Sequence, residues 1–256
     1  MLSVVLAVYN EEKNIGKCLE SVKSLAGEIV VIDGTSSDKT VEIAKQFGAL
    51  VTITDNPPIF HINKQKAVNQ SNGDWILQLD ADEIMTKELA EEITTTITSN
   101  NANDGYYLKR KNYFLGRWLS KGGQYPDPVI RLFKKGKGTF PCKSVHEQIE
   151  ITGTVGTLQN DLMHFMARNL DKYLENSDRY TTLTAKEWSG RYSFFNPVVL
   201  VKYLFIMPVY TFMMLYFRHK GLVDGFPGFI FAFFSGFHFV TAYVKFLGMK
   251  ISRTSS

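Results

Sequence analysis

The sequence predicts an α/β protein in which a mainly parallel sheet with flanking helices is followed by a C-terminal hydrophobic helical hairpin. In the first 100 residues, short apolar runs alternate four times with segments of helical periodicity. This alternation is typical of a parallel sheet covered on both faces. Apolar residues make up 45% of the 256 residues, which is enough for a sizeable core. Near the C-terminus, two long stretches carry almost no charge.

Each element follows from a local pattern. Continuous apolar runs bounded by polar residues predict buried strands, and apolar residues three or four positions apart predict helices. The strands are expected at residues 2–8, 28–32, 49–54 and 75–79. Helices are expected from a cap at Asn10 to Leu25, from 41 to 47 with an end at Gly48, and at 61–71, 87–97 and 169–188.

Charge and cysteine content narrow the class of protein. The net charge of +4 is too small to favour nucleic acid as a partner. Cys18 and Cys142 lie far apart without metal-ligand spacing, so we expect free thiols in a reducing compartment. The segment after Met1 has no basic region and no small-residue cleavage site, so no signal peptide is indicated. The catalytic part is therefore expected in the cytoplasm.

Polar residues gather directly after three of the predicted strands. In a parallel sheet these carboxyl ends meet at one edge, where ligands bind. The residues are Asn10 and Glu11 after the first strand, Asp33, Thr35, Ser36 and Asp38 after the second, and Asp80 and Asp82 after the fourth. Neither GxGxxG nor GxxxxGKS/T occurs, so the usual dinucleotide and P-loop solutions are absent.

The stretch WILQLDADE, residues 75–83, leads an apolar strand into three carboxylates. Like charges this close together persist either in open water or around a cation. Within a regular strand Asp80 and Asp82 would share one face while Ala81 points away, so the pair could face one hard cation such as Mg²⁺ or Mn²⁺. The alternative is an acidic strand end that caps the next helix.

Several motifs, in this order, resemble those of the nucleotide-sugar-dependent glycosyltransferases of family 2, which have the GT-A fold. They are SVVLAVYNEEKNI, VIDGTSSDKT, LDADE, RLFKKGKGTF, SVHEQI and LMHF, and the resemblance covers about residues 2–185. The chain looks most like small bacterial members that build lipooligosaccharide or lipopolysaccharide core, of the glucosyltransferase type. The resemblance implies transfer of a hexose from a nucleotide diphosphate sugar. A divalent cation, Mg²⁺ or Mn²⁺, would bridge the diphosphate oxygens as a Lewis acid.

The resemblance also assigns residues to the nucleotide sugar. They are Ala7, Tyr9, Glu11, Asp33, Asp38, Lys64, Lys66 and Asp80. Asp82 is the firmer metal ligand by the same resemblance, and Asp80 faces the donor directly or through the metal. Asp33 is expected to accept hydrogen bonds from uracil or ribose, although the stretch GTSSD could also be a turn in which Ser36 or Ser37 caps the next helix.

Two further donor contacts have structural alternatives. Tyr9 could contact the base or pack in the core. One of Lys64 and Lys66 is expected to face the diphosphate, whose charge a cation complements. The alternative is that this basic run is only the solvated face of a helix.

The second half of the chain is expected to bind the acceptor. An inverting transferase needs a general base that takes the proton from the acceptor hydroxyl as it attacks the anomeric carbon. In SVHEQI, Glu147 matches the family's HE element and is the candidate base, with His146 orienting it or touching substrate. Asp127 is the second candidate. By resemblance, Arg131 positions phosphate or acceptor, and His164 either completes the metal shell or is a hydrogen-bonded core residue.

Two apolar runs near the C-terminus predict association with a membrane. Residues 194–217 carry only one charge, and residues 225–244 carry none, so either is long enough to span a bilayer. Pro197 and Pro208 interrupt the first run, and the loop RHKGLVDG and both flanks are basic. The positive-inside rule disfavours placing that loop outside, which favours an in-plane or re-entrant hairpin over two crossings. A buried helical pair in a soluble protein is the third alternative.

The sequence thus predicts an inverting, metal-dependent hexosyltransferase at the cytoplasmic face of a bacterial membrane, acting on a lipid-linked saccharide. Residues 1–190 are expected to form the catalytic domain, with a nucleotide-sugar half at 1–100 and an acceptor half at 101–190. Residues 191–256 are expected to form a membrane-associated helical region. The alternatives are a polyprenyl-phosphate glycosyltransferase, a nucleotidyltransferase or a non-catalytic nucleotide-sugar binding module. Glu147 weighs against the first, since a phosphate acceptor needs no base.

Overall fold

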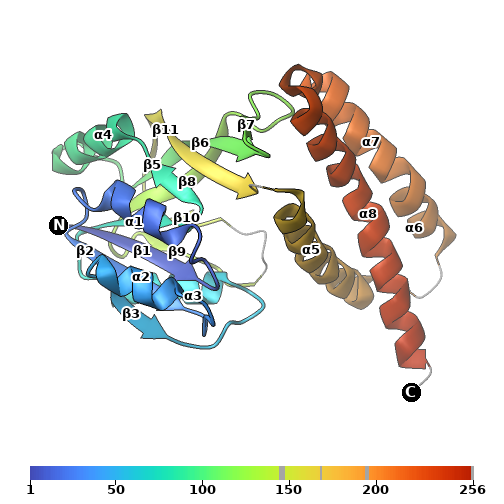
Figure 1. Cartoon of the computed structure of the whole chain (residues 1–256), viewed down its shortest axis with the longest axis horizontal. Helices are drawn as coiled ribbons and strands as arrows, with labels where there is room; N and C mark the ends of the chain where they lie inside the picture. Colours follow the sequence, from blue (N-terminus) through green and yellow to red (C-terminus); the bar gives the residue numbers. More distant parts are fainter. Residues whose placement is uncertain (144–147, 168, 194–195, 255–256) are drawn as a thin grey trace. The chain divides into compact units, whose positions relative to one another are not determined.

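A computed structural model describes residues 1–143, 148–167, 169–193 and 196–254 (Figure 1). The chain forms two compact units. The first comprises Met1–Arg110 and Asp127–His164, and the second comprises Lys111–Pro126 and Phe165–Ser256. The functional division expected at residues 100 and 190 stays a prediction.

The first unit is built on a mixed sheet, which confirms the predicted α/β class. Its strand order is β3-β2-β1-β4-β8-β6-β11-β5, and the end of β6 that belongs to the second unit pairs with β7. The strands are β1 (Leu2–Val8), β2 (Glu28–Asp33), β3 (Leu50–Ile53), β4 (Trp75–Leu79), β5 (Glu83–Met85), β6 (Gly105–Phe114), β7 (Arg117–Trp118), β8 (Asp127–Lys134) and β11 (Val155–Ala167). β9 (Gly138–Thr139) and β10 (Glu150–Ile151) form a separate pair. The first four strands pair in parallel because helical crossovers connect them, whereas β8 runs antiparallel to both β4 and β6.

The central position of β1 explains its uninterrupted apolar run. It pairs with β2 on one side and β4 on the other, and both of its faces are covered. Val4 and Leu6 face one core, which includes residues of α1 (Ile15–Val22), α2 (Thr40–Gln46) and α4 (Lys87–Thr98). Val5 faces the opposite core, which includes residues of α3 (His61–Gln70).

The start of α1 differs from the prediction. The helix begins at Ile15, and Asn14 occupies its N-cap position, so Asn10 is not the cap. Asn10 instead adopts a left-handed backbone with φ of 53°, a conformation that asparagine tolerates better than most residues. Asn10 is engaged instead by hydrogen bonds to Ser36 and Ser37 of the loop after β2.

The second unit contains the long C-terminal helices. α5 (Leu170–Arg191) is followed by a helical stretch, Pro197–Arg218, which contains α6 (Pro197–Val201), the π-helical turns η1 (Lys202–Ile206) and η2 (Met214–Arg218), and α7 (Met207–Met213). A short turn, η3 (Gly221–Asp224), leads to α8 (Gly225–Thr254). Both apolar stretches are long enough to cross a membrane.

The two prolines do not break the first apolar stretch. Pro197 lies at the start of α6, where the side chain of Asn196 accepts hydrogen bonds from the next two N–H groups. A proline at this position loses no helical hydrogen bond. Pro208 is the second residue of α7 and lies two positions after the wider π-helical turn η1, which leaves room for its ring.

Candidate active site

The loops after β1 and β2 are tied together at the carboxyl edge of the sheet. The backbone N–H of Asn10 donates to Ser36 Oγ at 2.8 Å, and the side-chain oxygen of Asn10 accepts from the backbone N–H of Ser37 at 2.8 Å. The backbone N–H of Glu11 donates to Thr40 Oγ1 at 2.8 Å. Two of the three predicted polar groups therefore meet, as expected for neighbouring parallel strands.

Asp33 ends β2 with its side chain buried, 1% exposed. Its Oδ2 accepts from the backbone N–H of Ser36 at 2.8 Å. Its Oδ1 is buried and has no hydrogen-bond partner among the residues that the structure describes. An unsatisfied buried acceptor costs on the order of 1–3 kcal/mol, so a ligand N–H or O–H that reached Oδ1 would recover that cost. Asp33 is thus suited to bind a hydrogen-bond donor.

Asp38 organises the loop itself. Its Oδ1 accepts from the N–H of Thr40 at 3.0 Å, and its Oδ2 accepts from the N–H of Glu12 at 3.1 Å. Burial opposes ionisation, but the hydrogen bonds from Thr40 and Glu12 outweigh it and lower the pKa of Asp38. Asp38, rather than Ser36 or Ser37, therefore satisfies the first N–H of α2, and the serine-cap alternative is wrong.

The other predicted residues at the end of β1 differ in exposure. Ala7 is half-buried within the strand. Tyr9 is 44% exposed, so it is not a core residue and its ring is accessible to a ligand. Glu11 is half-buried, and its Oε2 accepts from the side-chain nitrogen of Asn14 at 2.7 Å.

Asp80 lies between two buried cations. Lys64 of α3 is ion-paired with its Oδ1, and the Arg131 guanidinium of β8 contacts its Oδ2 at 2.6 Å. Burial alone would raise the pKa of Asp80, but Arg131 and Lys64 hold it well below its usual range. Burial lowers the pKa of Lys64 even beside this carboxylate. Lys64 is 6% exposed, so it is not part of a solvated helix face.

Lys66 lies in a different environment from Lys64. Its ammonium donates to Thr54 Oγ1 at 2.8 Å and contacts Asp55 Oδ1 at 3.2 Å. The side chain is 38% exposed. Lys66 therefore belongs to the solvent-facing side of α3, which leaves Lys64 as the lysine that contacts an Asp80 oxygen.

Glu83 supports this cluster from within the core. It is fully buried, and its Oε1 contacts the Arg131 guanidinium at 2.7 Å. Its Oε2 accepts from the backbone N–H of Asp80 at 2.9 Å, which closes the turn after β4. Arg131 also donates to the side chain of Gln78, so three acceptors surround one guanidinium. Asp80, Glu83 and Arg131 thus form one buried network.

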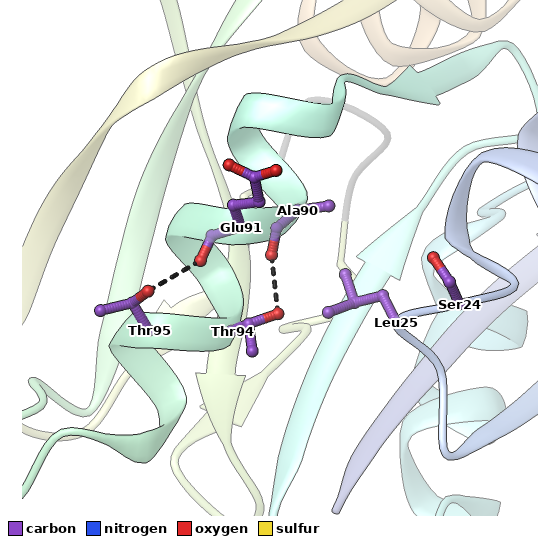
Figure 2. A pocket seen from close by; sticks show the side chains of 6 residues that line it. All are labelled: Ser24, Leu25, Ala90, Glu91, Thr94 and Thr95. Atoms are coloured by element: carbon purple, nitrogen blue, oxygen red, sulfur yellow. Dashed lines mark hydrogen bonds between the residues drawn. The ribbon is translucent and has the colours of Figure 1, made fainter.

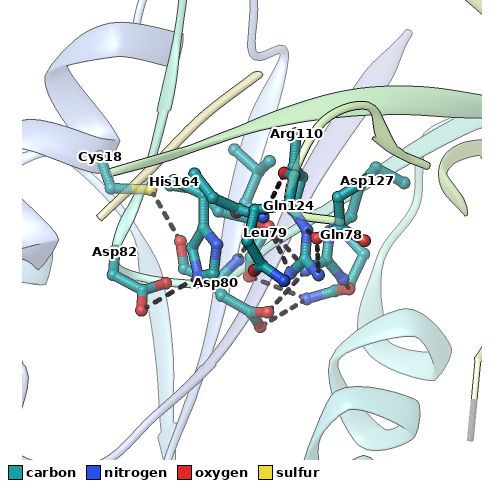
Figure 3. A network of polar contacts seen from close by, with 12 residues as sticks. Cys18, Gln78, Leu79, Asp80, Asp82, Arg110, Gln124, Asp127 and His164 are labelled. Atoms are coloured by element: carbon teal, nitrogen blue, oxygen red, sulfur yellow. Dashed lines mark hydrogen bonds and ion pairs between the residues drawn. The ribbon is translucent and has the colours of Figure 1, made fainter. Parts of the chain in front are cut away.

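The side chains of Asp80 and Asp82 contact different partners, contrary to the prediction that they share one face. β4 ends at Leu79, so the alternation of a regular strand does not extend to either residue. Asp82 instead lies beside His164 of β11, with 3.5 Å between Oδ2 and Nε2 (Figure 3). Burial lowers the pKa of His164, but the Asp82 charge outweighs it and raises that pKa. The Asp82 side chain is 30% exposed, so its carboxylate remains accessible.

The structure describes one of the two candidate bases, Asp127. Asp127 lies at the start of β8. Its Oδ2 accepts hydrogen bonds from Nε of Arg110 at 3.0 Å and from Nη2 of Arg110 at 2.6 Å. Both hydrogen bonds fall on Oδ2, so one oxygen of the Asp127 carboxylate is already engaged by Arg110. His146 and Glu147 lie outside the described residues.

Asp82 and His164 fit a divalent cation as two protein ligands. Carboxylate oxygen and imidazole nitrogen are both ligands that Mn²⁺ accepts, and carboxylate suits Mg²⁺. Within the described residues no three His, Cys, Asp or Glu side chains come together as a metal site. Among the described residues, Asp82 and His164 would therefore supply two ligands of a coordination shell. Diphosphate oxygens are of the hard type that could supply the remainder.

Sequence reasoning missed three members of this site. Gln78 is a polar residue inside an otherwise apolar strand, and a buried polar residue needs partners, so it was a usable signal. Glu83 was recognised only as the third carboxylate of the stretch WILQLDADE, with no role at the site assigned to it. Arg110 stands between two other basic residues, Lys109 and Lys111, in β6, so nothing in the sequence singled it out.

A pocket elsewhere on the first unit is a weaker candidate for the active site. It is lined by Ser24 and Leu25 after α1 and by Ala90, Glu91, Thr94 and Thr95 of α4 (Figure 2). Its two threonine hydroxyls donate to carbonyls of the same helix, at 2.9 and 3.0 Å. We therefore assign the site to the carboxyl edge of the sheet.

Replacing Glu83 with glutamine is expected to destabilise the first unit. The substitution keeps the side chain's size but removes one of the charges that compensate buried Arg131, which costs about 3 kcal/mol in free energy of unfolding. Denaturant unfolding measures this loss. Glu42→Gln, on the exposed face of α2, is the matched control. Equal stability of the two variants would contradict the role assigned to Glu83.

Carboxylates and buried cations at the carboxyl edge of an α/β sheet suit an enzyme that handles phosphorylated ligands. The sequence comparisons point to the same class. The model of glycosyl transferase family 2 matches residues 3–155, more than half of the chain, and this chain belongs to that family. It is thus a glycosyltransferase, and the family and GT-A fold predicted from its motifs are confirmed.

Relatives extend the similarity over most of the chain. The lipopolysaccharide core biosynthesis glycosyltransferase LpsC of Rhizobium meliloti is 29% identical over 247 residues, covering 91% of this chain and 89% of LpsC. An uncharacterized glycosyltransferase of Rickettsia typhi is 25% identical over 241 residues, covering 90% and 80%. Among solved structures, S. aureus TarS 1–349 in complex with UDP-GlcNAc has a TM-score of 0.49 at 15% identity, covering 96% and 88%. Glucosyl-3-phosphoglycerate synthase from Mycobacterium tuberculosis, with Mn²⁺ and UDP, has a TM-score of 0.38 at 22% identity and covers 44% of each chain.

Proposed function

We propose that this glycosyltransferase is inverting and moves a hexose from a nucleotide diphosphate sugar to a lipid-linked saccharide of a bacterial surface glycan. A UDP-sugar is the donor we propose. One observation carries the proposal. The edge formed by β1, β2 and β4 offers a buried Asp33 oxygen without a partner among the described residues, together with an accessible Asp82 carboxylate. The first suits a nucleoside and the second a diphosphate-bound cation.

Donor binding is assigned to the first half of the chain. Asp33 Oδ1 accepts a hydrogen bond from uracil or ribose, and the exposed Tyr9 ring contacts the base. Lys64 faces the diphosphate while it neutralises Asp80. When bound, a divalent cation held by Asp82 and His164 would offset the negative charge that develops on the departing diphosphate.

Acceptor activation is assigned to the second half. Glu147 takes the proton from the acceptor hydroxyl as that oxygen forms a bond to the anomeric carbon. The bond between the anomeric carbon and the diphosphate oxygen breaks, and the nucleoside diphosphate leaves from the opposite face, which inverts the configuration. Asp127 is the weaker candidate because Arg110 already holds it.

The acceptor and the location follow from the similarity to LpsC and from the apolar C-terminal stretches. LpsC is named for lipopolysaccharide core biosynthesis, so a lipid-linked saccharide is the acceptor we propose. The two apolar stretches support a membrane-associated region at 191–256, with the catalytic region 1–190 at the cytoplasmic face. A polyprenyl-phosphate acceptor is the second candidate.

A donor panel tests the proposal. Purified protein is incubated with UDP-, GDP- and dTDP-sugars, with Mn²⁺ or with EDTA, and the released nucleotide is identified. We expect nucleoside diphosphate release from one nucleotide class, lost in EDTA and reduced in Asp33→Ala. Release of nucleoside monophosphate with sugar phosphate would contradict glycosyl transfer. Metal-independent release would remove the cation from the proposal.

A further inference from the structure

Both apolar stretches of the second unit expose large apolar side chains, and these residues are here called the lipid face. Six of its members, from both stretches, are 45–74% exposed: Val198, Phe205, Val209, Phe226, Phe233 and Val244. The opposite side of the helices packs around Trp188, Tyr203 and Tyr243. Apolar surface of this extent is not stable against water, so it needs a covering partner.

The start of α8 is fastened to the loop between β7 and β8. Asp224 is 2% exposed. Its carboxylate accepts hydrogen bonds from the backbone N–H of Ser120 at 3.0 Å and from the Ser120 hydroxyl at 2.9 Å. It also accepts from the backbone N–H of Lys121 at 2.9 Å. The backbone N–H of Gly122 donates to the carbonyl of His219 at 2.9 Å. The turn between the two apolar stretches therefore lies against this polar loop.

The second half of α8 is fastened to the polar helix α5. The Lys245 ammonium donates to the carboxylate of Asp178 at 2.7 Å and to the hydroxyls of Thr181 and Thr182 at 2.9 and 2.7 Å. The two fastenings are 21 residues apart along the chain, from 224 to 245. At 1.5 Å per helical residue this is about 30 Å, the thickness of the hydrocarbon core of a bilayer.

If α8 crossed a bilayer, the two fastenings would lie on opposite sides of it. Their partners cannot do so. The chain from Ser120 to Asp178 contains no apolar run long enough to span, and α5 carries charges along its length. The loop after β7 and α5 must therefore lie on the same side of any membrane. Both ends of α8 then lie on that side too.

We infer that the lipid face inserts into a single leaflet, with the α6–α8 hairpin held parallel to the membrane and its connecting turn on the same side as α5. The partner is a bilayer surface, and this inference rests on the membrane association proposed above. The exposed Arg218 and Lys220 of the turn and the exposed Lys202 suit anionic headgroups. Aromatic side chains on the inserted face are typical of interfacial helices.

Cysteine labelling tests the sidedness. Lys220→Cys places a thiol in the connecting turn, and Asp171→Cys places one on the exposed start of α5. Both are made in a chain whose Cys18 and Cys142 are replaced by serine. An impermeant maleimide is applied to spheroplasts and to inside-out vesicles. We expect both thiols to react in inside-out vesicles and to be protected in spheroplasts. Reaction of the two thiols from opposite sides would overturn the inference.

Vesicle binding tests the lipid face itself. Phe226→Asp and Phe233→Asp each place a charge on it, and we expect at least tenfold weaker flotation with vesicles containing anionic lipid. Ser252→Asp, near the end of α8, is a charge-matched control. Unchanged flotation of both variants would overturn the lipid face. Donor hydrolysis, measured on the same proteins in detergent, reports the proposed enzymatic function separately, so a failure of either can be distinguished.

Discussion

Replacing Asp82 with alanine is expected to abolish sugar transfer and metal-dependent nucleotide binding. Asp82 is the accessible carboxylate after β4, and its Oδ2 lies 3.5 Å from Nε2 of His164. Without it the diphosphate charge is poorly neutralised during departure. Loss of a single preorganised electrostatic group costs about 10²–10³ in rate, and loss of the cation adds to that. Titration of UDP with and without Mn²⁺ measures the binding loss.

The control for Asp82 lies at the opposite end of the same strand. Asp74, just before β4, is exposed and contacts only the N-terminal ammonium among its described ion pairs. Asp74→Ala should therefore retain transfer and Mn²⁺-dependent binding. Full activity of Asp82→Ala in the presence of EDTA would sink the assignment of Asp82 to a cation.

Replacing Glu147 with glutamine is expected to slow the chemical step by roughly two to four orders of magnitude while donor affinity is kept. Glutamine preserves size and hydrogen bonding but cannot take the proton of the acceptor hydroxyl. Calorimetric titration of the donor and single-turnover transfer separate the two effects. Glu150→Gln, three residues further along in β10, is the matched control.

A different result would move the base elsewhere. If Glu147→Gln lost donor affinity while bound enzyme turned over at the normal rate, Glu147 would be a binding residue. Asp127→Asn would then be the next variant, although Asp127 is paired with Arg110. Loss of folding in Asp127→Asn would show that this pair is structural.

Sequence patterns predicted the parallel half of the fold closely. Leu2–Val8 and Trp75–Leu79 begin and end where the apolar runs do, because strands buried on both faces need uninterrupted apolar residues. The helix predicted at 87–97 is Lys87–Thr98. The carboxyl edge was also predictable, since parallel strands joined by helical crossovers place their polar ends together.

The partners of each polar side chain were decided only by the tertiary structure. Alternation along a strand predicted that Asp80 and Asp82 act together, but the strand ends before them, and distant residues then separate the two. Arg131, 51 positions from Asp80, holds one carboxylate, while His164 of β11 lies beside the other. The sequence likewise determined that the C-terminal stretches are apolar, because hydropathy is a property of the residues themselves. That Asp224 and Lys245 fasten α8 at both ends depends on contacts over about 100 and 65 positions, which no local pattern encodes.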